Sequence, residues 1–223
     1  MQLINNKNIP EHIGIVIDGN REWAEERNLA PADGFLKGFN KIWVAASWFF
    51  ALGVKIVSVR VFSVEDWEKS REEVNLLLKI FKENLEKISA NPEIIKYKVV
   101  FSGLTTELPG DLPDLCEDLI LATKNNQGGT LHFGLNYGGR QEIVSAVKKM
   151  VANGIEPEQI HEGMIRKYFD HSELGDVDVI IKCGGEQTLF GFLLWQSAYS
   201  RIVFLQKYWP DFEESDAVAL IKN

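Results

Sequence analysis

Short apolar segments alternate with longer amphipathic segments along this chain of 223 residues. The apolar segments are rich in valine and isoleucine, which is typical of strands buried on both faces of a sheet. Strands are therefore predicted at residues 12–17, 55–62, 97–102, 130–136, 177–182 and 201–205.

The amphipathic segments predict helices between these strands. Gly53 suits the position after a helix C-terminus, and Pro157 suits the first turn of a helix. The alternation predicts an α/β fold with a mostly parallel six-stranded sheet flanked by helices. No repeat, low-complexity tract or linker interrupts it, so residues 1–223 are expected to form a single domain. The main helices are predicted at residues 35–52, 71–90, 112–125, 139–153, 157–169 and 213–221.

Composition narrows the range of partners and compartments. The net charge of -8 argues against wholesale binding of nucleic acid. Cys116 and Cys183 lie far apart without metal-ligand spacing, so we expect two reduced thiols in a cytoplasmic protein. The residues before Pro10 are too few and too polar for a signal peptide, and no apolar run reaches the roughly 18 residues that a membrane span needs.

The tripeptide Asp18-Gly19-Asn20 ends the first apolar segment, and a short helix is expected around Trp23 and Ala24. Glycine lets a backbone approach a ligand closely, free N–H groups at a helix start attract anions, and a carboxylate can hold a divalent metal. The same tripeptide also occurs in ordinary turns. The functional interpretation predicts a phosphorylated ligand.

Three more polar segments follow predicted strands. They are residues 62–67, 136–140 and 182–186, and the last two each contain a Gly-Gly pair. Ligands of open α/β sheets bind beyond the carboxyl ends of the strands. Each glycine pair alone suits a tight turn, but together with Asp18-Gly19-Asn20 they predict a phosphate-binding crevice.

Several motifs occur in a fixed order from His12 to Phe212. This order is similar to that of the cis-prenyltransferase family, the undecaprenyl and dehydrodolichyl diphosphate synthases. The matching blocks are residues 12–20 (HIGIVIDGN), 62–67 (FSVEDW), 72–74 (EEV), 136–144 (NYGGRQEIV), 184–186 (GGE), 192–199 (FLLWQSAY) and 209–212 (WPDF).

The resemblance implies a reaction between isoprenoid diphosphates. An allylic diphosphate on the Asp-Gly-Asn loop ionises, isopentenyl diphosphate attacks in the presence of Mg²⁺, and proton loss leaves a Z double bond. The growing chain lies in an apolar tunnel, and the protein is expected to form a dimer with possible peripheral contact to a membrane. By resemblance the catalytic residues are Asp18, Ser63 and Asp66, with Asp18 also the metal ligand, and the substrate-binding residues are Gly19, Asn20, Arg21, Trp67, Lys69, Lys182 and Arg201.

The sequence departs from the family at its ligand positions. A family arginine is replaced by Glu22, the metal-binding glutamate aligns with Arg201, and no Arg-x-Gly occurs before Asn223 to reach across a dimer. The further departures are Pro31 and Phe35 for an arginine and a histidine, Asp66 for an asparagine, Lys69 and Lys182 for arginines, Thr188 for an arginine and Phe190 for a serine.

These departures weaken the predicted phosphate site. A charge-assisted arginine contact contributes roughly 1.5–3 kcal/mol, so the loss of several predicts that the standard isopentenyl diphosphate site is absent. Arg21 stands where the family usually has glycine and can partly replace the arginine lost at Glu22. Arg201 either supplies a fixed positive charge near Asp18 in place of the metal or forms a surface or interface ion pair.

The expected apolar tunnel also looks altered. Trp43, Trp48, Phe49 and Phe50 crowd one helix, and Val61 stands where a small residue usually precedes Phe-Ser. These aromatic residues are either plain core or the wall of a pocket that is short or closed. The four histidines show no partner pattern and are expected to be structural or exposed, and nothing supports a hydrolase.

Two interpretations remain open. The chain is a degenerate subunit that pairs with an intact cis-prenyltransferase, or it is an active prenyltransferase that condenses or cyclises allylic diphosphates at a rebuilt site. A third, weaker interpretation is a binding or carrier protein for isoprenoid diphosphates. All three place the protein in polyprenyl diphosphate metabolism.

Overall fold

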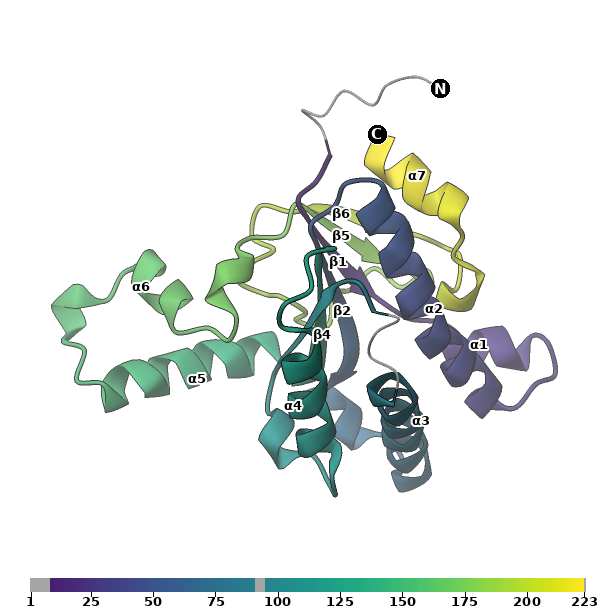
Figure 1. Cartoon of the computed structure of the whole chain (residues 1–223), viewed down its shortest axis with the longest axis horizontal. Coiled ribbons are helices and arrows are strands. Elements are labelled where there is room, and N and C mark those ends of the chain that lie inside the picture. Colours follow the sequence, from purple (N-terminus) through teal and green to yellow (C-terminus); the bar gives the residue numbers. More distant parts are fainter. Residues whose placement is uncertain (1–8, 91–94, 223) are drawn as a thin grey trace.

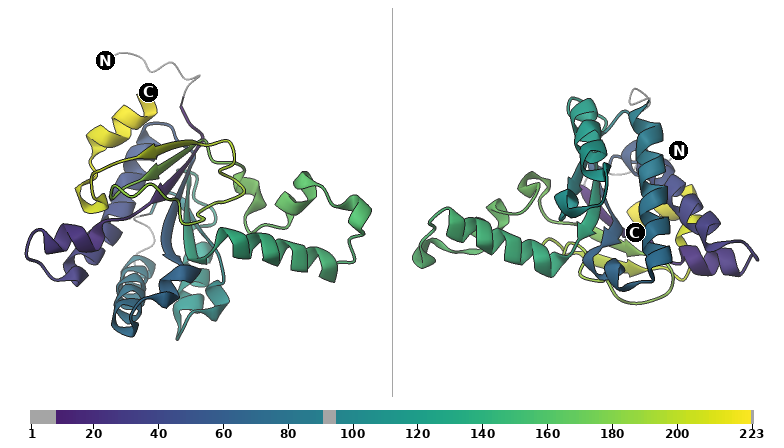
Figure 2. Two further views of the ribbon diagram at one scale, coloured as in Figure 1. Left: turned by 180° about the vertical axis from the view of Figure 1, so that it is seen from behind. Right: turned by 90° about the horizontal axis from the view of Figure 1, so that it is seen from below.

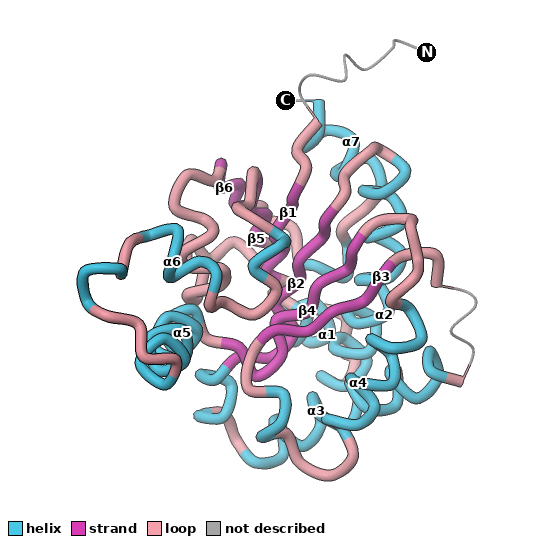
Figure 3. The backbone as a smooth tube through the Cα atoms, turned by 60° about the vertical axis from the view of Figure 1, so that its left-hand side comes forward, coloured by secondary structure: helices cyan, strands magenta, loops and turns pink. Residues whose placement is uncertain are grey.

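The computed structural model describes residues 9–90 and 95–222, in which six parallel strands form one sheet (Figure 1). The sheet order is β3-β4-β2-β1-β5-β6, and Figure 3 shows the strands side by side in this order. The sheet is wholly parallel within these residues, as the alternation of elements predicted. The strands are β1 (His12–Val16), β2 (Ile56–Ser63), β3 (Lys98–Ser102), β4 (Thr130–Tyr137), β5 (Val179–Lys182) and β6 (Arg201–Phe204).

Six of the helices in the described residues lie in connections between these strands, and α7 follows the last strand. They are α1 (Asn20–Glu25), α2 (Pro31–Ala51), α3 (Arg71–Ser89), α4 (Leu112–Thr123), α5 (Gly139–Ala152), α6 (Glu162–Lys167) and α7 (Glu214–Lys222). None of the helices in the described part of the chain is both long and apolar enough to cross a membrane.

One predicted helix is largely wrong. Residues 157–169 were expected to be helical from Pro157, but Pro157–Gln159 forms only a 3₁₀ turn and α6 is limited to Glu162–Lys167. Ile160 and His161 have extended backbones between the two. Gly163 inside α6 lowers helix propensity further, so the segment lacks the local preference to continue as one helix.

The main hydrophobic core lies between the sheet and helices α2, α3, α4 and α7. Phe49 of α2 is fully buried, and Trp43 of the same helix lies against Phe133 and Tyr97. Phe50 also contacts Tyr97. The crowded aromatic residues of α2 are therefore core side chains, which is the plainer of the two interpretations.

A smaller cluster covers the opposite face of the sheet. Tyr137, Phe192 and Leu193 are buried there together with residues of the strands. Beyond this face, α5 and α6 form an arm that extends away from the sheet, at the left of Figure 1 and at the right of the first view in Figure 2. The arm lies on the other side of the sheet from α1, α2 and α3.

Three buried polar side chains connect neighbouring strands in the sheet. Ser58 Oγ lies 2.7 Å from His12 Nε2 and 2.8 Å from His132 Nδ1, which joins β1, β2 and β4. Burial lowers the pKa of His12 to about 4 and holds that of His132 well below its ordinary value. Both histidines are therefore neutral structural residues at neutral pH, in agreement with the sequence-based expectation.

Candidate functional site

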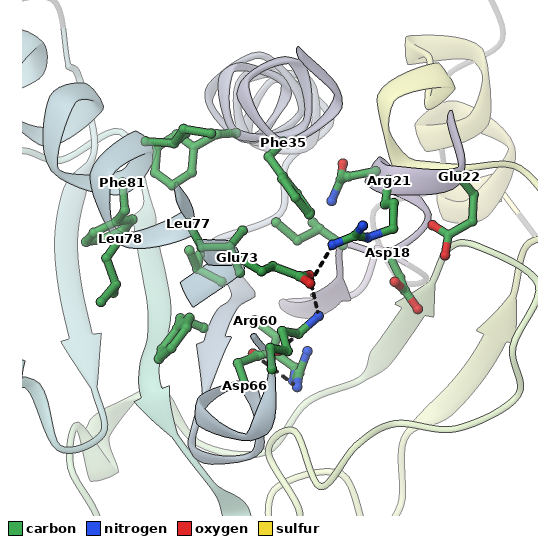
Figure 4. A pocket seen from close by; sticks show the side chains of 17 residues that line it. Asp18, Arg21, Glu22, Phe35, Arg60, Asp66, Glu73, Leu77, Leu78 and Phe81 are labelled. Atoms are coloured by element: carbon green, nitrogen blue, oxygen red, sulfur yellow. Dashed lines mark hydrogen bonds and ion pairs between the residues drawn. The ribbon is translucent and has the colours of Figure 1, made fainter. Parts of the chain in front are cut away.

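The four polar segments predicted to follow strands lie at one edge of the sheet. They follow β1, β2, β4 and β5, which are consecutive neighbours in the order β4-β2-β1-β5. A pocket opens at this edge, bounded by α1, α2, β2 and α3 (Figure 4). Its mouth is lined by polar and charged side chains and its inner end by apolar ones. The lining includes Asp18, Asn20, Arg21, Glu22, Arg60, Asp66, Lys69 and Glu73 at the mouth, and Phe35, Phe39, Val61, Phe62, Leu77, Leu78 and Phe81 further in.

Asp18 is already bound by the protein through both carboxylate oxygens. Lys182 donates from Nζ to Asp18 Oδ2 at 2.6 Å, and the backbone N–H of Gly19 donates to Oδ1 at 2.9 Å. The Lys182 side chain is completely buried, whereas that of Asp18 is 41% exposed. The two residues meet because β1 and β5 are parallel neighbours, with Val16 in register with Lys182. Lys182, predicted to bind substrate, instead lies beneath Asp18.

Glycines fix the loop that follows β1. Gly19 has a φ of 81°, and a Cβ there would overlap Tyr208. A Cβ at Gly34 or Gly38 of α2 would overlap Asn20. The loop, α1 and α2 are therefore held in close contact, and Asn20 remains at the pocket wall with an unpaired, buried Oδ1.

Arg21 and α3 meet across the mouth of the pocket. Arg21 Nη2 donates to Glu73 Oε2 at 2.5 Å, and Lys69 Nζ donates to Glu73 Oε1 at 3.0 Å (Figure 4). Arg21 and Lys69 were both predicted to bind substrate, and both line the pocket. Their charges are directed at Glu73, so an anionic ligand must compete with this carboxylate for them.

Ser63 and Asp66 form a compact unit at the end of β2. The backbone N–H and the hydroxyl of Ser63 both donate to Asp66 Oδ2, at 2.7 and 2.9 Å. Arg60 Nη2 donates to Ser63 Oγ at 2.5 Å and lies 3.6 Å from Asp66 Oδ2. Asp66, Ser63 and Arg60 thus hold one another, with Asp66 and Arg60 at the pocket wall.

Trp67 is outside the pocket but connects two of the predicted segments. Its indole N–H donates to Asn136 Oδ1 at 2.8 Å, and its ring contacts Phe62 edge to face. The ring is 41% exposed. Trp67 therefore holds the segment after β2 against the segment after β4.

Phe190 covers the two buried cations near the mouth. Its ring centroid is 5.2 Å from the guanidinium carbon of Arg60 and 5.4 Å from Lys182 Nζ. Its φ of 50° is in the left-handed region, which is unusual for a bulky residue. The aromatic ring thus lies against two positive charges, where it takes up space close to both.

The inner end of the pocket is closed by apolar side chains. Phe39 and Phe81 contact each other edge to face, with ring centroids 5.3 Å apart. The whole pocket, with its polar mouth included, has a volume of about 140 Å³. A short apolar group fits this space, whereas a long one meets buried aromatic rings.

Two sequence-predicted features lie away from the pocket. Arg201 is at the amino end of β6 and in register with Val179 rather than Lys182, and its Nη2 donates to the carbonyl of Leu220. Within one chain it is therefore not beside Asp18, so the hypothesis that it replaces a metal there lacks support. A Cβ at Gly138 would overlap Val64, and one at Gly139 would overlap Gly191, which gives this pair a close-packing role, and neither glycine lines the pocket at Asp18.

Sequence reasoning missed two charged residues at the mouth, Arg60 and Glu73. Arg60 interrupts the apolar run of β2, and a charge within a buried strand was a usable signal. Glu73 lies in the first turn of α3, and Lys69, just before that helix, reaches it. Nothing in the sequence showed that Arg21 would meet Glu73.

The residues present do not fit the Mg²⁺ ion that the resemblance implied. Both oxygens of Asp18 are engaged, and the family's second carboxylate ligand is replaced by Arg201. Among the described residues, no group of three or more potential side-chain ligands is placed to hold a metal ion. A cation at Asp18 would have to approach a carboxylate that the ammonium of Lys182 already neutralises.

Comparison with known proteins places this site in a family. A family model described as putative undecaprenyl diphosphate synthase matches residues 16–223. The chain belongs to this family, the cis-prenyltransferases. Its six-stranded α/β architecture is the family fold, as the sequence predicted.

Among cis-prenyltransferases, several relatives match almost the whole chain. The tritrans,polycis-undecaprenyl-diphosphate synthase (geranylgeranyl-diphosphate specific) of Sulfurisphaera tokodaii is 37% identical over 99% of this chain and 87% of its own length. An isoprenyl transferase of Fusobacterium nucleatum is 37% identical over 97% of this chain and 93% of its own. These relatives place the chain in isoprenoid metabolism.

Two solved cis-prenyltransferase structures are similar to this one. Lavandulyl diphosphate synthase from Lavandula x intermedia, in complex with dimethylallyl diphosphate, has a TM-score of 0.89 and 27% identity, covering 96% of this chain and 94% of that one. A probable undecaprenyl diphosphate synthase from Campylobacter jejuni has a TM-score of 0.81 and 21% identity over the same shares. The second similarity concerns the fold alone.

Proposed function

We propose that this protein is a prenyltransferase that binds one short allylic diphosphate in the pocket and transfers its allylic group to an acceptor other than isopentenyl diphosphate. The observation that carries this proposal is the polarity of the pocket. Its mouth bears Asn20, Arg21 and Arg60, and its inner end is closed by Phe39 and Phe81. A diphosphate suits the mouth, and a short hydrocarbon suits the closed end.

A solved relative supports the choice of a short substrate. The lavandulyl diphosphate synthase structure, 27% identical to this chain, contains dimethylallyl diphosphate. The undecaprenyl diphosphate synthases that match this chain act on longer chains by name, and the closed cavity of about 140 Å³ argues against such a chain here.

Phe190 supports the choice of acceptor. Its ring lies against both Arg60 and Lys182 and so limits the approach of a second diphosphate to these positive charges. Glu22 adds a negative charge at the same mouth. Both features disfavour a second anionic headgroup at this position, so an allylic diphosphate acceptor presents its double bond with its own diphosphate held elsewhere, and an uncharged acceptor needs no such site.

The residues at the mouth suit the following roles. The allylic C–O bond breaks, the diphosphate leaves with the electron pair, the acceptor double bond forms the new C–C bond, and a proton is lost. Asn20 and Arg21 hold the departing diphosphate, with Lys69 as a second cation. Asp66, oriented by Ser63, is the carboxylate available to take the proton.

A product assay tests the proposal. The purified protein is incubated with labelled dimethylallyl, geranyl or farnesyl diphosphate, with and without isopentenyl diphosphate. We expect a product from dimethylallyl diphosphate alone that disappears in Asp66→Asn. No product from any combination contradicts the proposal.

The second candidate function is a degenerate subunit of a heteromeric prenyltransferase. It is favoured by Glu22 and Arg201, which stand at family ligand positions and cannot fulfil those roles. Co-purification with an intact family member, together with no product from the chain alone, would establish this function instead.

The proposal includes a second copy of the chain as partner. Val144, Val147 and Val151 form an exposed stripe along α5 of the arm, and Leu194 and Tyr199 nearby are also exposed. A second copy that covers this stripe would bury it.

We place the protein in the cytoplasm, with peripheral contact to a membrane, because buried free thiols such as Cys116 suit a reducing compartment.

A further inference from the structure

The carboxylate of Asp18 is neutralised from within the protein. Lys182 Nζ donates to Asp18 Oδ2 at 2.6 Å and to the carbonyl oxygen of Cys183 at 2.9 Å. The ring of Phe190 covers another side of the ammonium, and the lysine side chain is completely buried. The lysine therefore has neither the freedom to leave Asp18 nor direct access to the pocket.

The ammonium of Lys182 is placed to neutralise the Asp18 carboxylate, as a divalent ion bound at Asp18 would do. Without a cation, the carboxylate at the mouth would repel a diphosphate bound to Asn20 and Arg21. With Lys182 in place the pair is neutral, and the repulsion is removed before any ligand arrives. A metal ion at this carboxylate is disfavoured, since Oδ2 already accepts from the ammonium, Oδ1 accepts from the Gly19 N–H and the ion would meet the positive charge of Lys182.

We infer that Lys182 is a built-in replacement for the divalent cation at Asp18, so that this protein binds an allylic diphosphate without a metal ion. The inference deepens the proposed function and rests on it, because a diphosphate must bind at this pocket. Lys182 is a positioning and charge-balancing residue rather than one that touches the substrate.

Binding of dimethylallyl thiolodiphosphate, whose C–S bond resists ionisation, tests the inference without turnover. Its affinity is measured by titration calorimetry in EDTA and in excess Mg²⁺. We expect equal affinities in the two buffers. Binding in Mg²⁺ alone overturns the inference and leaves the proposed function intact, whereas no binding in either buffer overturns the proposed function itself.

Lys182→Met keeps the length of the side chain and removes its charge. In EDTA we expect affinity to fall by about tenfold or more, because Asp18 is left negative beside the diphosphate. Added Mg²⁺ is expected to restore the affinity, since Oδ2 becomes free. Lys207→Met is the matched control, because Lys207 pairs with Asp216 at 2.7 Å and does not line the pocket. An unchanged affinity in Lys182→Met contradicts the inference.

Asp18→Asn provides an independent test if Lys182→Met fails to fold, as judged by circular dichroism. Removing the carboxylate leaves the ammonium of Lys182 uncompensated near the mouth. We therefore expect binding in EDTA to be at least as tight as in the unmodified protein. A metal-holding carboxylate predicts the opposite sign, so loss of binding in Asp18→Asn overturns the inference.

Discussion

Arg21 on α1 and Glu73 on α3 form an ion pair of 2.5 Å that spans the mouth of the pocket. Lys69 also points its charge at Glu73, at 3.0 Å. One carboxylate therefore holds two cations that a diphosphate needs. The pocket is formed, but its cations are committed to a side chain rather than to a ligand.

Replacing Glu73 with glutamine should tighten the binding of dimethylallyl thiolodiphosphate. Arg21 and Lys69 would no longer be neutralised, and a negative charge would leave the mouth. Because both cations are partly exposed, we expect a gain of about two- to tenfold. Glu83→Gln, on an exposed part of α3, is the control for charge alone. Equal gains in both variants, measured by calorimetry, would assign the effect to net charge and contradict the prediction.

Leu77→Ala should lengthen the pocket. Leu77 is a partly buried lining residue, and its truncation opens space toward Phe81 at a cost of about 2 kcal/mol in stability. We expect the ratio of geranyl to dimethylallyl diphosphate affinity to rise about tenfold. Leu76→Ala, the neighbouring partly buried residue outside the pocket, should leave the ratio unchanged. A ratio unaffected by Leu77→Ala would show that this wall does not set chain length.

Phe190→Ser should admit a second diphosphate. The substitution removes the ring that lies against Arg60 and Lys182 and reduces the strain of a bulky residue at a φ of 50°. We expect labelled isopentenyl diphosphate to enter products of this variant and not those of the unmodified protein. Incorporation by both proteins would show that Phe190 leaves the acceptor site open.

The sequence predicted most strands and helices because each strand carries its own apolar run and each long helix its own amphipathic pattern. It did not reveal strand order, which is set by long-range contacts. Asp18 and Lys182 are 164 positions apart, and their contact follows only from β1 and β5 being neighbours. Without the strand register, the family alignment suggested Arg201 as a cation near Asp18. The register instead pairs Arg201 with Val179, at the end of β5 and β6 that is remote from Lys182.

The stability of the protein should fall in weakly acidic solution because of the buried histidines. Burial lowers the pKa of His12 to about 4, whereas in the unfolded chain it is near 6.5. The unfolded state therefore binds more protons between these values, so the free energy of unfolding decreases as the pH falls from about 6.5 to about 4. The shift at His12 corresponds to about 3 kcal/mol. His132 acts in the same direction.

Urea unfolding between about pH 7 and about pH 4.5 measures this dependence. His12→Gln should be less stable at neutral pH, since the bond to Ser58 is disturbed, but its stability should change less with pH. His161→Gln, at an exposed position, is the control. A pH dependence equally steep in His12→Gln would assign the acid sensitivity to other groups.

Val147→Asp should weaken self-association. Val147 lies in the middle of the exposed valine stripe on α5, so an aspartate there would be buried by a second copy without a partner. Sedimentation equilibrium should show a dimer for the unmodified protein and a monomer for the variant. Lys148→Asp, the adjacent exposed residue, is the control for an added negative charge. A monomeric unmodified protein would contradict the proposed assembly.

The hydrogen bonds among His12, Ser58 and His132 favour one register of β1, β2 and β4 over its neighbours. Strands that are buried on both faces carry apolar side chains on each, so apolar burial alone distinguishes neighbouring alignments less sharply than in a half-exposed sheet. A slip of β2 by one residue would turn Ser58 to the other face and leave two imidazoles buried without their shared partner. The same alignment sets the ends of β1 and β2 and thereby the separation of Asp18 and Ser63. Three polar residues remote from the pocket thus determine which chemical groups face one another within it.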